Sequence, residues 1–474
     1  MSYPQKKPKL SQSHNQSHNE EPVAGPSNDE SPPKIFKLNI DCFDEIFEYL
    51  NVKDLHSFGQ TCKRMNKVAG EYFKQNYSSA EKFCEEDGIH TVYSDKDGVI
   101  DERIQTSGFH KFMPCISIDV DPYKYINSHI SEFESTNHIF LSDLCINNET
   151  VERFKKLLPQ LEILQSRHCA MDGDFYDLIL KYCKNLRRIY VQNSTVGNRI
   201  NGEIKWLLQK YPKLERLELI PAVSCRIEEL REFFVHNPNA QRFSTTSAFL
   251  WRNADTFLNS KAKLDILELK EFQFYTPYYS CGKHTLETPL ELLNRLHEQG
   301  FYKRLYICIH WVDEEESTSF ASLNGLELLC ISSFEKSYNL TQLTNLRELI
   351  IFDGSNSKDM DIIANGLTKL ERLYIKWASI DEIMPFIRRS PKLNKIKFIP
   401  EDSGVVLNLA MLNEERAKLA GARKIIIYTR DDVFLATKWT TRNGDTNLNF
   451  IEMRRADSYD WEPCVLLNEL DVFL

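Results

Sequence analysis

The feature that most constrains the fold of this chain is a short string of residues that recurs along it. The sequence KLERLEL at residues 213–219 returns with small changes at residues 345–351, 369–375 and 392–398. In each copy the last two apolar residues are two positions apart, so they share one face of an extended strand while the residue between them faces the other way. With weaker copies included, the repeats begin at residues 161, 186, 214, 240, 264, 302, 326, 346, 370, 393 and 422.

The intervals between these first positions are 25, 28, 26, 24, 38, 24, 20, 24, 23 and 29 residues by subtraction. Most lie within the range of about 20–29 residues found for leucine-rich repeats. Helix-start signals occur between the strands, with Pro289 following the capping residue Thr288 and a capping box at Ser379 and Glu382. The array therefore resembles leucine-rich repeats. We expect an α/β solenoid, or horseshoe, over residues 136–430, with a curved parallel sheet and helices outside.

The 38-residue interval predicts an inserted loop at residues 271–284. This loop is a second candidate binding element, although it could also pack onto its own repeat. It carries the aromatic residues Phe272, Phe274, Tyr275, Tyr278 and Tyr279.

The regions outside the array differ in composition. Residues 1–34 are rich in Ser, Asn, His and Pro, which predicts a disordered N-terminal tail. Residues 78–135 are expected to be a linker or atypical first repeats, with an early strand at Cys115–Ile118. Residues 431–474 are expected to form a C-terminal cap or tail, because the repeat pattern fades there.

Residues 35–77 show helical rather than strand periodicity. Phe43, Ile46, Phe47 and Leu50 are three or four residues apart, and Asp41 is placed to cap the helix that they define. A second apolar series runs over residues 55–68 with the same spacing. The segment is predicted to be a small all-α domain of two or three short helices, which would gain stability from a partner.

The stretch LNIDCFDEIFEYL at residues 38–50, followed by DL at 54–55 and CKR at 62–64, resembles the F-box. Two positions depart from the usual pattern of that family: Asn39 stands in place of a proline and Met65 in place of a frequent tryptophan. An ordinary helical bundle with an internal core is the alternative reading. The resemblance implies docking onto a Skp-type adaptor, and through it a cullin, by the residues Leu38, Phe43, Ile46, Phe47, Leu50 and Leu55.

The residues between the paired apolar positions should line the concave face of the sheet. In the first column of this face, which ends at Lys424, six of ten residues are basic. We expect an acidic or phosphorylated target segment to bind there, with arginines as bidentate donors. The alternative is internal pairing with acids such as Glu215, Asp265 and Glu371. The predicted target-binding residues are Arg188, Tyr190, Arg216, Arg304, Tyr306, Arg372, Tyr374, Lys395 and Lys397.

Composition narrows the class of function. The net charge of −9 disfavours nucleic acid as a partner, and no apolar run resembles a signal peptide or a membrane span. A cytoplasmic or nuclear location is expected. The cysteines show no CxxC pair, and no phosphate loop, GxSxG or HExxH motif occurs, so we expect no metal, no cofactor and no catalytic residues.

These features predict a non-enzymatic substrate-recognition subunit of a cullin-RING ubiquitin ligase of the SCF type. It would bind the adaptor through the F-box and a target protein through the concave face. Two alternatives stay open: a protein-interaction scaffold with no role in ubiquitination, and an RNA-binding repeat protein.

Overall fold

The computed structural model describes only part of the chain. The described residues are 35, 38–77, 81–85, 88–94, 101–104, 109–118, 130–149, 152, 155–171, 181–196, 203–222, 226–272, 288–352, 357–441 and 448–455. The predicted tail at 1–34 lies outside these residues.

Three short helices come first, as the apolar spacing predicted: α1 (Ile40–Phe47), α2 (Val52–Gly59) and α3 (Lys63–Asn76). The cap expected at Asp41 is wrong. The side-chain oxygen of Asn39 instead accepts a hydrogen bond from the Cys42 N–H at 2.9 Å, which satisfies one of the free donors of the first turn of α1. The apolar faces of the helices meet in a separate small core.

A tight contact joins α3 to the segment that follows. Gly70 lies on α3, and a Cβ atom at this position would lie only 2.0 Å from a ring carbon of Phe112. Phe112 belongs to the short helix η2 (His110–Phe112). The absence of a side chain at Gly70 therefore lets η2 pack directly on the helix.

The rest of the described chain is organised around a 17-stranded sheet. Its first three strands are an antiparallel extension in which β2 pairs with both β1 and β3. From β4 onward every neighbour is parallel, and from β4 to β19 the order in space follows the order in sequence. The strands are β1 (Glu81–Glu85), β2 (Gly88–Ser94), β3 (Asp101–Ile104), β4 (Cys115–Ile118), β5 (His138–Ser142), β7 (Ile163–Arg167), β9 (Arg188–Ser194), β10 (Arg216–Pro221), β11 (Arg242–Thr245), β12 (Leu264–Leu269), β13 (Tyr302–Val312), β14 (Leu326–Phe334), β15 (Glu348–Ile351), β16 (Arg372–Ala378), β17 (Lys395–Pro400), β18 (Ile425–Thr429) and β19 (Ile451–Arg455).

Two further short strands, β6 (Cys145–Ile146) and β8 (Ala170–Met171), pair with each other outside this sheet. All eleven repeat copies found in the sequence contribute a strand to the main sheet, and the early strand at Cys115–Ile118 is β4. The prediction of a mixed α/β region with a parallel sheet is confirmed.

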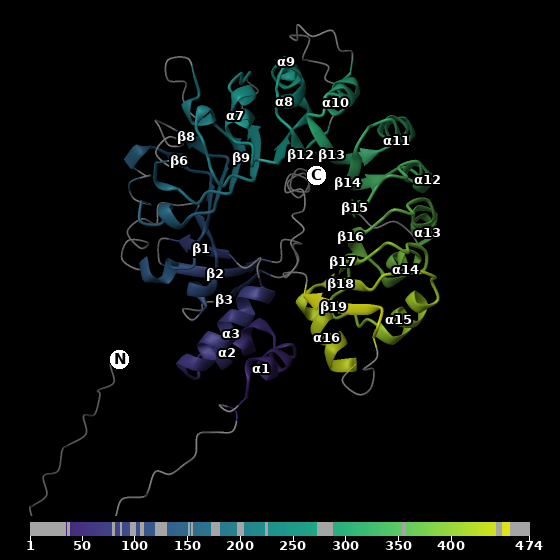
Figure 1. Ribbon diagram of the computed structural model, residues 1–474. Helices are drawn as coiled ribbons and strands as arrows, with labels where there is room; N and C mark the ends of the chain where they lie inside the picture. Colours follow the sequence, from purple (N-terminus) through teal and green to yellow (C-terminus); the bar gives the residue numbers. More distant parts are fainter. Residues whose placement is uncertain are drawn as a thin grey trace, which may run out of the picture.

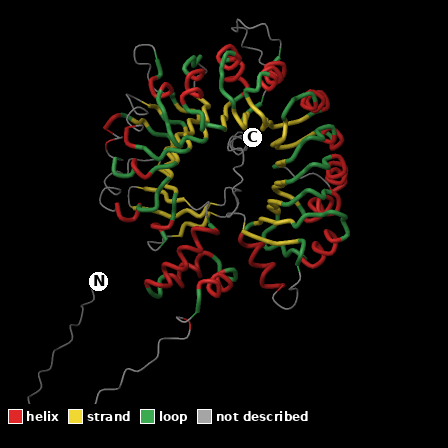
Figure 2. The backbone as a smooth tube through the Cα atoms, viewed as in Figure 1, coloured by secondary structure: helices red, strands yellow, loops and turns green. Residues whose placement is uncertain are grey.

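Helices cover one face of the sheet. Figures 1 and 2 show the sheet as a curve with its strands on the inner side and the helices on the outer side. The large core lies between the two layers, where Leu217, Leu219 and their equivalents in other strands are buried. The outer segments include η4 (Leu158–Gln160), η5 (Lys205–Leu208), α7 (Leu230–His236), α8 (Ser247–Arg252), α9 (Ala254–Leu258), α10 (Pro289–Glu298), α11 (Glu314–Ala321), α12 (Ser337–Thr341), α13 (Ser357–Gly366), α14 (Ile380–Arg389), α15 (Leu409–Ala417) and α16 (Asp431–Thr441).

The two ends of the curve meet at the N-terminal helices, as Figure 1 shows for α1 and α16. Arg455, the last residue of β19, donates from Nη2 to the carbonyl oxygen of Leu50 at 2.8 Å and from Nη1 to the hydroxyl of Tyr72. Beside it, Lys438 Nζ on α16 lies 2.6 Å from Glu48 Oε2. We call these five residues the seam. Arg455 is only 1% exposed, so its contacts in the seam are buried, and they join residues 383 and 405 positions apart.

No helix in the described part is long and apolar enough to cross a membrane. The same residues contain no group of His, Cys, Asp and Glu side chains able to hold a metal ion.

Candidate functional sites

The face of the sheet opposite to the helices, here called the inner face, carries the predicted target-binding residues. Neighbouring strands place Arg188, Arg216 and Arg242 side by side in one row. Arg242 is not among the predicted residues, because its repeat begins with Ala240 instead of leucine. Three guanidinium groups on adjacent strands, about 4.8 Å apart, repel one another unless carboxylates lie between them.

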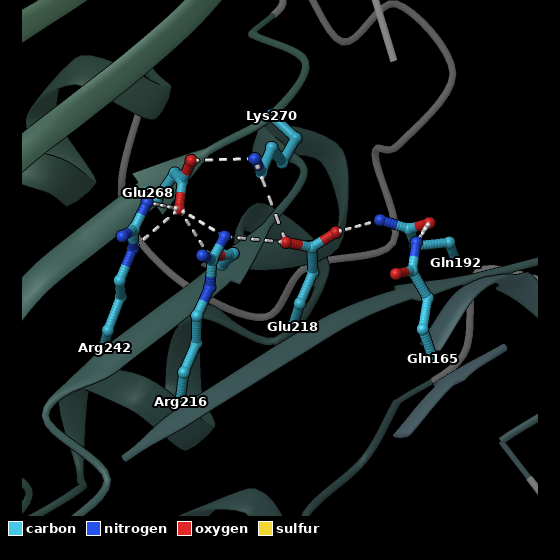
Figure 3. Close-up of polar contacts among 8 residues, drawn as sticks. Gln165, Gln192, Arg216, Glu218, Arg242, Glu268 and Lys270 are labelled. Carbon is cyan, nitrogen blue, oxygen red and sulfur yellow. Dashed lines mark hydrogen bonds and ion pairs between the residues drawn. The ribbon is translucent and has the colours of Figure 1, made fainter. Parts of the chain in front are cut away.

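A network of polar side chains neutralises two members of this row, Arg216 and Arg242 (Figure 3). Arg216 Nη2 lies 3.1 Å from Oε2 of both Glu218 and Glu268. Arg242 Nη2 is 2.8 Å and Lys270 Nζ 2.9 Å from carboxylate oxygens of Glu268. Every charged group of the network thus has an opposite partner within the protein.

Neutral side chains extend the network along the sheet. Gln192 donates to Glu218 at 2.5 Å and Gln165 donates to Gln192 at 3.1 Å, while the Ser244 hydroxyl donates to Glu268 at 2.7 Å. We call this part of the inner face the charged half. It consists of Gln165, Gln192, Arg216, Glu218, Arg242, Ser244 and Glu268 on β7 to β12, and of Lys270, which directly follows β12.

The buried charges of the charged half balance one another. Burial alone would raise the pKa of the Glu268 carboxyl, but Arg242, Lys270 and Arg216 together hold this pKa well below its ordinary value. Arg216 is only 4% exposed, and its guanidinium also lies 4.9 Å from the centre of the Tyr190 ring. Breaking one member would leave buried charges without their partners.

Three of the predicted target-binding arginines have partners within the protein. Arg216 binds Glu218 and Glu268, Arg304 binds Asp265, and Arg372 Nη1 lies 3.2 Å from Glu348 Oε1. For these three residues the structure supports the alternative of internal pairing. Counting basic residues in the sequence therefore overstates the positive charge that this face offers to a ligand.

The register of the sheet changes between β13 and β14. A β-bulge separates Leu305 from Tyr306, so that Tyr306 pairs with Leu328 and the row of Arg304 does not continue into β14. Beyond this bulge the inner face is mostly apolar. We call this part the apolar half; it consists of Tyr306, Cys308, Leu328, Cys330, Ile350, Phe352, Tyr374 and Ile399 on β13 to β17, where Phe352 directly follows β15.

Two lysines border the apolar half. Lys397 Nζ lies 4.7 Å from the centre of the Tyr374 ring, and Lys376 Nζ lies 5.9 Å from that of Phe352 and 5.0 Å from that of Trp377. Trp377 has a φ of 56°, a left-handed conformation that is strained for a large side chain and that interrupts the strand at a second bulge. Aromatic faces and ammonium groups together suit a ligand that carries both apolar and acidic groups.

The aromatic loop predicted at 271–284 lies almost wholly outside the described residues. Its Phe272 is described and is buried against Phe320, with ring centres 5.4 Å apart. This one residue therefore packs onto the protein itself. The other four aromatic residues of the loop stay untested.

The six predicted adaptor contacts on the N-terminal helices divide by burial. Phe43, Phe47 and Leu55 are 0% exposed and form the core of the helical bundle. Leu38 and Leu50 are half-buried. Ile46 lies at the surface and is 37% exposed. The buried aromatic rings support the surface from within, since Phe43 stacks on Phe47 at 5.8 Å between ring centres.

Comparison with known proteins bears on these helices. The family model of the F-box domain matches residues 35–72, which span α1, α2 and most of α3. The N-terminal helices form an F-box domain. No match to the chain is found among curated proteins. F-box proteins are typically non-catalytic adaptor subunits, and the match ends before the first strand of the sheet.

The structure adds to the F-box a surface that the sequence pattern did not reveal. Ile40, the first residue of α1, is 64% exposed, and Ile35 is also exposed. The helical spacing of apolar residues had directed attention to the inward face of α1, whereas Ile40 lies outside that series. With Ile46, these isoleucines are the exposed large apolar side chains of the described F-box residues.

Proposed function

We propose that this protein is the substrate-recognition subunit of an SCF-type ubiquitin ligase. Its F-box domain binds a Skp-type adaptor and thereby a cullin, and the inner face of its sheet binds a target protein. Ubiquitin transfer is performed by other subunits, and the protein acts in the cytoplasm or the nucleus. The observation that carries this proposal is the coupling, in one chain, of an F-box domain to a large curved sheet with a chemically distinct inner face.

In this proposal the strand and helix units are leucine-rich repeats stacked as a solenoid. Two observations support the assignment. The eleven strands found from the sequence pair in parallel and in chain order, and the leucines of the motif point into the core beneath the outer helices. Such stacks offer long concave surfaces, on which repeat proteins bind their partners.

The target in this proposal binds on the apolar half. The charged half is internally neutralised, so a ligand there would have to displace existing ion pairs. The apolar half is lined by aromatic and aliphatic side chains together with the ammonium groups of Lys376 and Lys397. This combination fits an acidic segment that also carries apolar side chains.

The adaptor arm is tested by replacing exposed F-box residues. Ile40→Asp combined with Ile46→Asp places charges on the surface without disturbing the buried Phe43 and Phe47, so binding of a purified Skp-type adaptor should be lost while the fold is kept. Val235→Asp is the matched control, because Val235 is 48% exposed on the distant helix α7. Unchanged adaptor binding by the double variant, or no binding by the wild type, contradicts the proposal.

The target arm is tested in cells with and without proteasome inhibition. A protein captured by the wild-type chain should accumulate on inhibition, and Lys376→Glu with Lys397→Glu should reduce its capture. Lys418→Glu serves as control, since Lys418 is exposed just after α15. A captured partner whose level does not respond to inhibition favours a scaffold without a role in degradation.

A further inference from the structure

Lys376 is a buried cation on the inner face. It is only 6% exposed, and among the described residues it forms no ion pair; its ammonium group lies beside the rings of Phe352 and Trp377. Burying an ammonium group beside apolar side chains is costly unless an anion accompanies it. The inner face at β15 to β17 is therefore suited to an occupant that brings a carboxylate together with apolar groups.

The chain itself contains a segment of this chemistry beyond the described residues. Residues 456–474 read ADSYDWEPCVLLNELDVFL and contain no Lys or Arg. The acidic residues alternate with large apolar residues, among them Trp461, Leu466, Leu467 and Phe473. The acidic residues of the segment are Asp457, Asp460, Glu462, Glu469 and Asp471.

The point where this segment begins is fixed close to the apolar half. It follows Arg455, which the seam holds at the end of β19. Parallel register carries the sheet from β19 through β18 and β17 to β16, so Lys376 lies three strands away, or about 14 Å at ~4.8 Å per strand. The 19 residues from 456 to 474 can span up to about 65 Å when extended, which is enough to cross the whole apolar half.

We propose that residues 456–474 dock on the apolar half of the inner face and compete there, within the same molecule, with the target. This inference rests on the proposed function, because it assigns an internal competitor to the surface that binds the target. Tethering gives the segment an effective concentration on the order of mM, so a target has to bind well enough to displace it. Acidic side chains meet Lys376 and Lys397, and the apolar side chains cover Tyr374 and its neighbours.

Hydrogen exchange in the full-length chain tests the docking directly. Backbone amides of residues 456–474 should exchange at least about 10-fold more slowly than in a synthetic peptide of the same sequence. Lys376→Glu with Lys397→Glu should remove this protection, whereas Lys418→Glu with Lys303→Glu, two residues with highly exposed side chains, should keep it. Equal exchange in the chain and the peptide, or protection that survives the first double variant, overturns the proposal.

Binding of the same peptide, fluorescently labelled, tests the competition. A chain that lacks residues 456–474 should bind the peptide at least about 10-fold more tightly than the full-length chain. The full-length variant with Asp457→Asn, Asp460→Asn, Glu462→Gln, Glu469→Gln and Asp471→Asn should bind it like the shortened chain, which covers the case that the deletion fails to fold. Equal peptide binding by the wild-type chain and this variant contradicts the proposal.

Adaptor binding by the same preparations separates the two proposals. If the adaptor binds but the segment shows neither protection nor competition, the proposed function stands and the internal competitor is rejected. If the adaptor does not bind, the proposed function is rejected, and docking of the segment is judged by exchange and peptide binding alone.

Discussion

The two halves of the inner face lie on the same parallel sheet, but they accommodate buried charged side chains in different ways. In the charged half, Arg216, Arg242 and Lys270 converge on Glu268, so burial is balanced by ion pairs within the sheet. In the apolar half, Tyr374 and its neighbours are buried beside Lys376, which has no ion pair among the described residues. A basic residue on a repeat surface therefore indicates a binding site only when the structure leaves its charge unmatched.

The largest expected effect comes from breaking the charged half. Arg216→Ala leaves Glu218 and Glu268 buried with one guanidinium fewer, which should destabilise the fold by about 3–5 kcal/mol. The midpoint of urea unfolding measures this loss. A midpoint within experimental error of the wild type would show that the network is not tightly coupled.

A smaller effect of opposite sign is expected in the apolar half. Lys376→Met removes a buried ammonium group and keeps most of its apolar volume, so in a chain that lacks residues 456–474 it should stabilise the fold by about 1 kcal/mol or more. In the full-length chain the gain should be smaller, because the substitution also removes the proposed contact with that segment. Equal gains in the two chains, again from urea unfolding, speak against the contact.

The pKa values of two inner-face carboxyls, Glu268 and Glu348, should shift in opposite directions. The pKa of Glu268 is lowered well below its ordinary value by the three surrounding cations, which outweigh its burial. The pKa of Glu348 is raised from its ordinary value because burial outweighs Arg372 and its other neighbours. As the pH falls from 7, Glu348 should take up a proton first, and carbon-13 chemical shifts of the two carboxyls measure the order.

The two shifts act on stability with opposite signs. Relative to Glu268→Gln, the wild type keeps its full advantage above pH 4.5, the ordinary value for glutamate, and loses it as the pH falls through the lower folded-state pKa. Relative to Glu348→Gln, the wild type becomes less stable as the pH rises from 4.5 through the higher folded-state pKa. Parallel pH profiles for the two variants contradict the contrast between the halves.

The smallest effect is expected at the exposed rim. Arg187 Nη2 lies 2.6 Å from Glu215 Oε1, but both side chains are about half exposed. Solvent screens such a pair, so Arg187→Ala should shift the midpoint of urea unfolding far less than Arg216→Ala does. A loss of stability as large as that caused by Arg216→Ala would show that burial does not determine the strength of these ion pairs.

Much of the architecture follows from periodicity alone. The recurring two-residue spacing, as in Leu217 and Leu219, locates β7 and all the strands from β9 to β18. Apolar residues spaced three or four positions apart locate the N-terminal helices. The antiparallel strands β1 to β3 and the last strand β19 carry no copy of the string and were not predicted. Their place in the sheet depends on neighbours that are distant in sequence.

The inner face was harder to predict, because its chemistry depends on partners across strands. The register places Ile426, not the expected Lys424, in line with Lys395. Arg216 meets Glu268 from 52 positions away, a pairing that no local pattern encodes. The bulge at Leu305 and Tyr306 likewise depends on how two strands fit together, and it decides where the charged half ends.

The seam gives the molecule a closed outline in which the F-box is fastened to both ends of the sheet, through η2 on one side and Arg455 on the other. Closure removes the hinge that a single linker would leave between the two parts. In the proposed ligase subunit, a bound target would be held in one fixed orientation relative to the adaptor. Only lysines on the side of the target that faces the conjugating enzyme would come within its reach. The rigid geometry would therefore determine which lysine is modified.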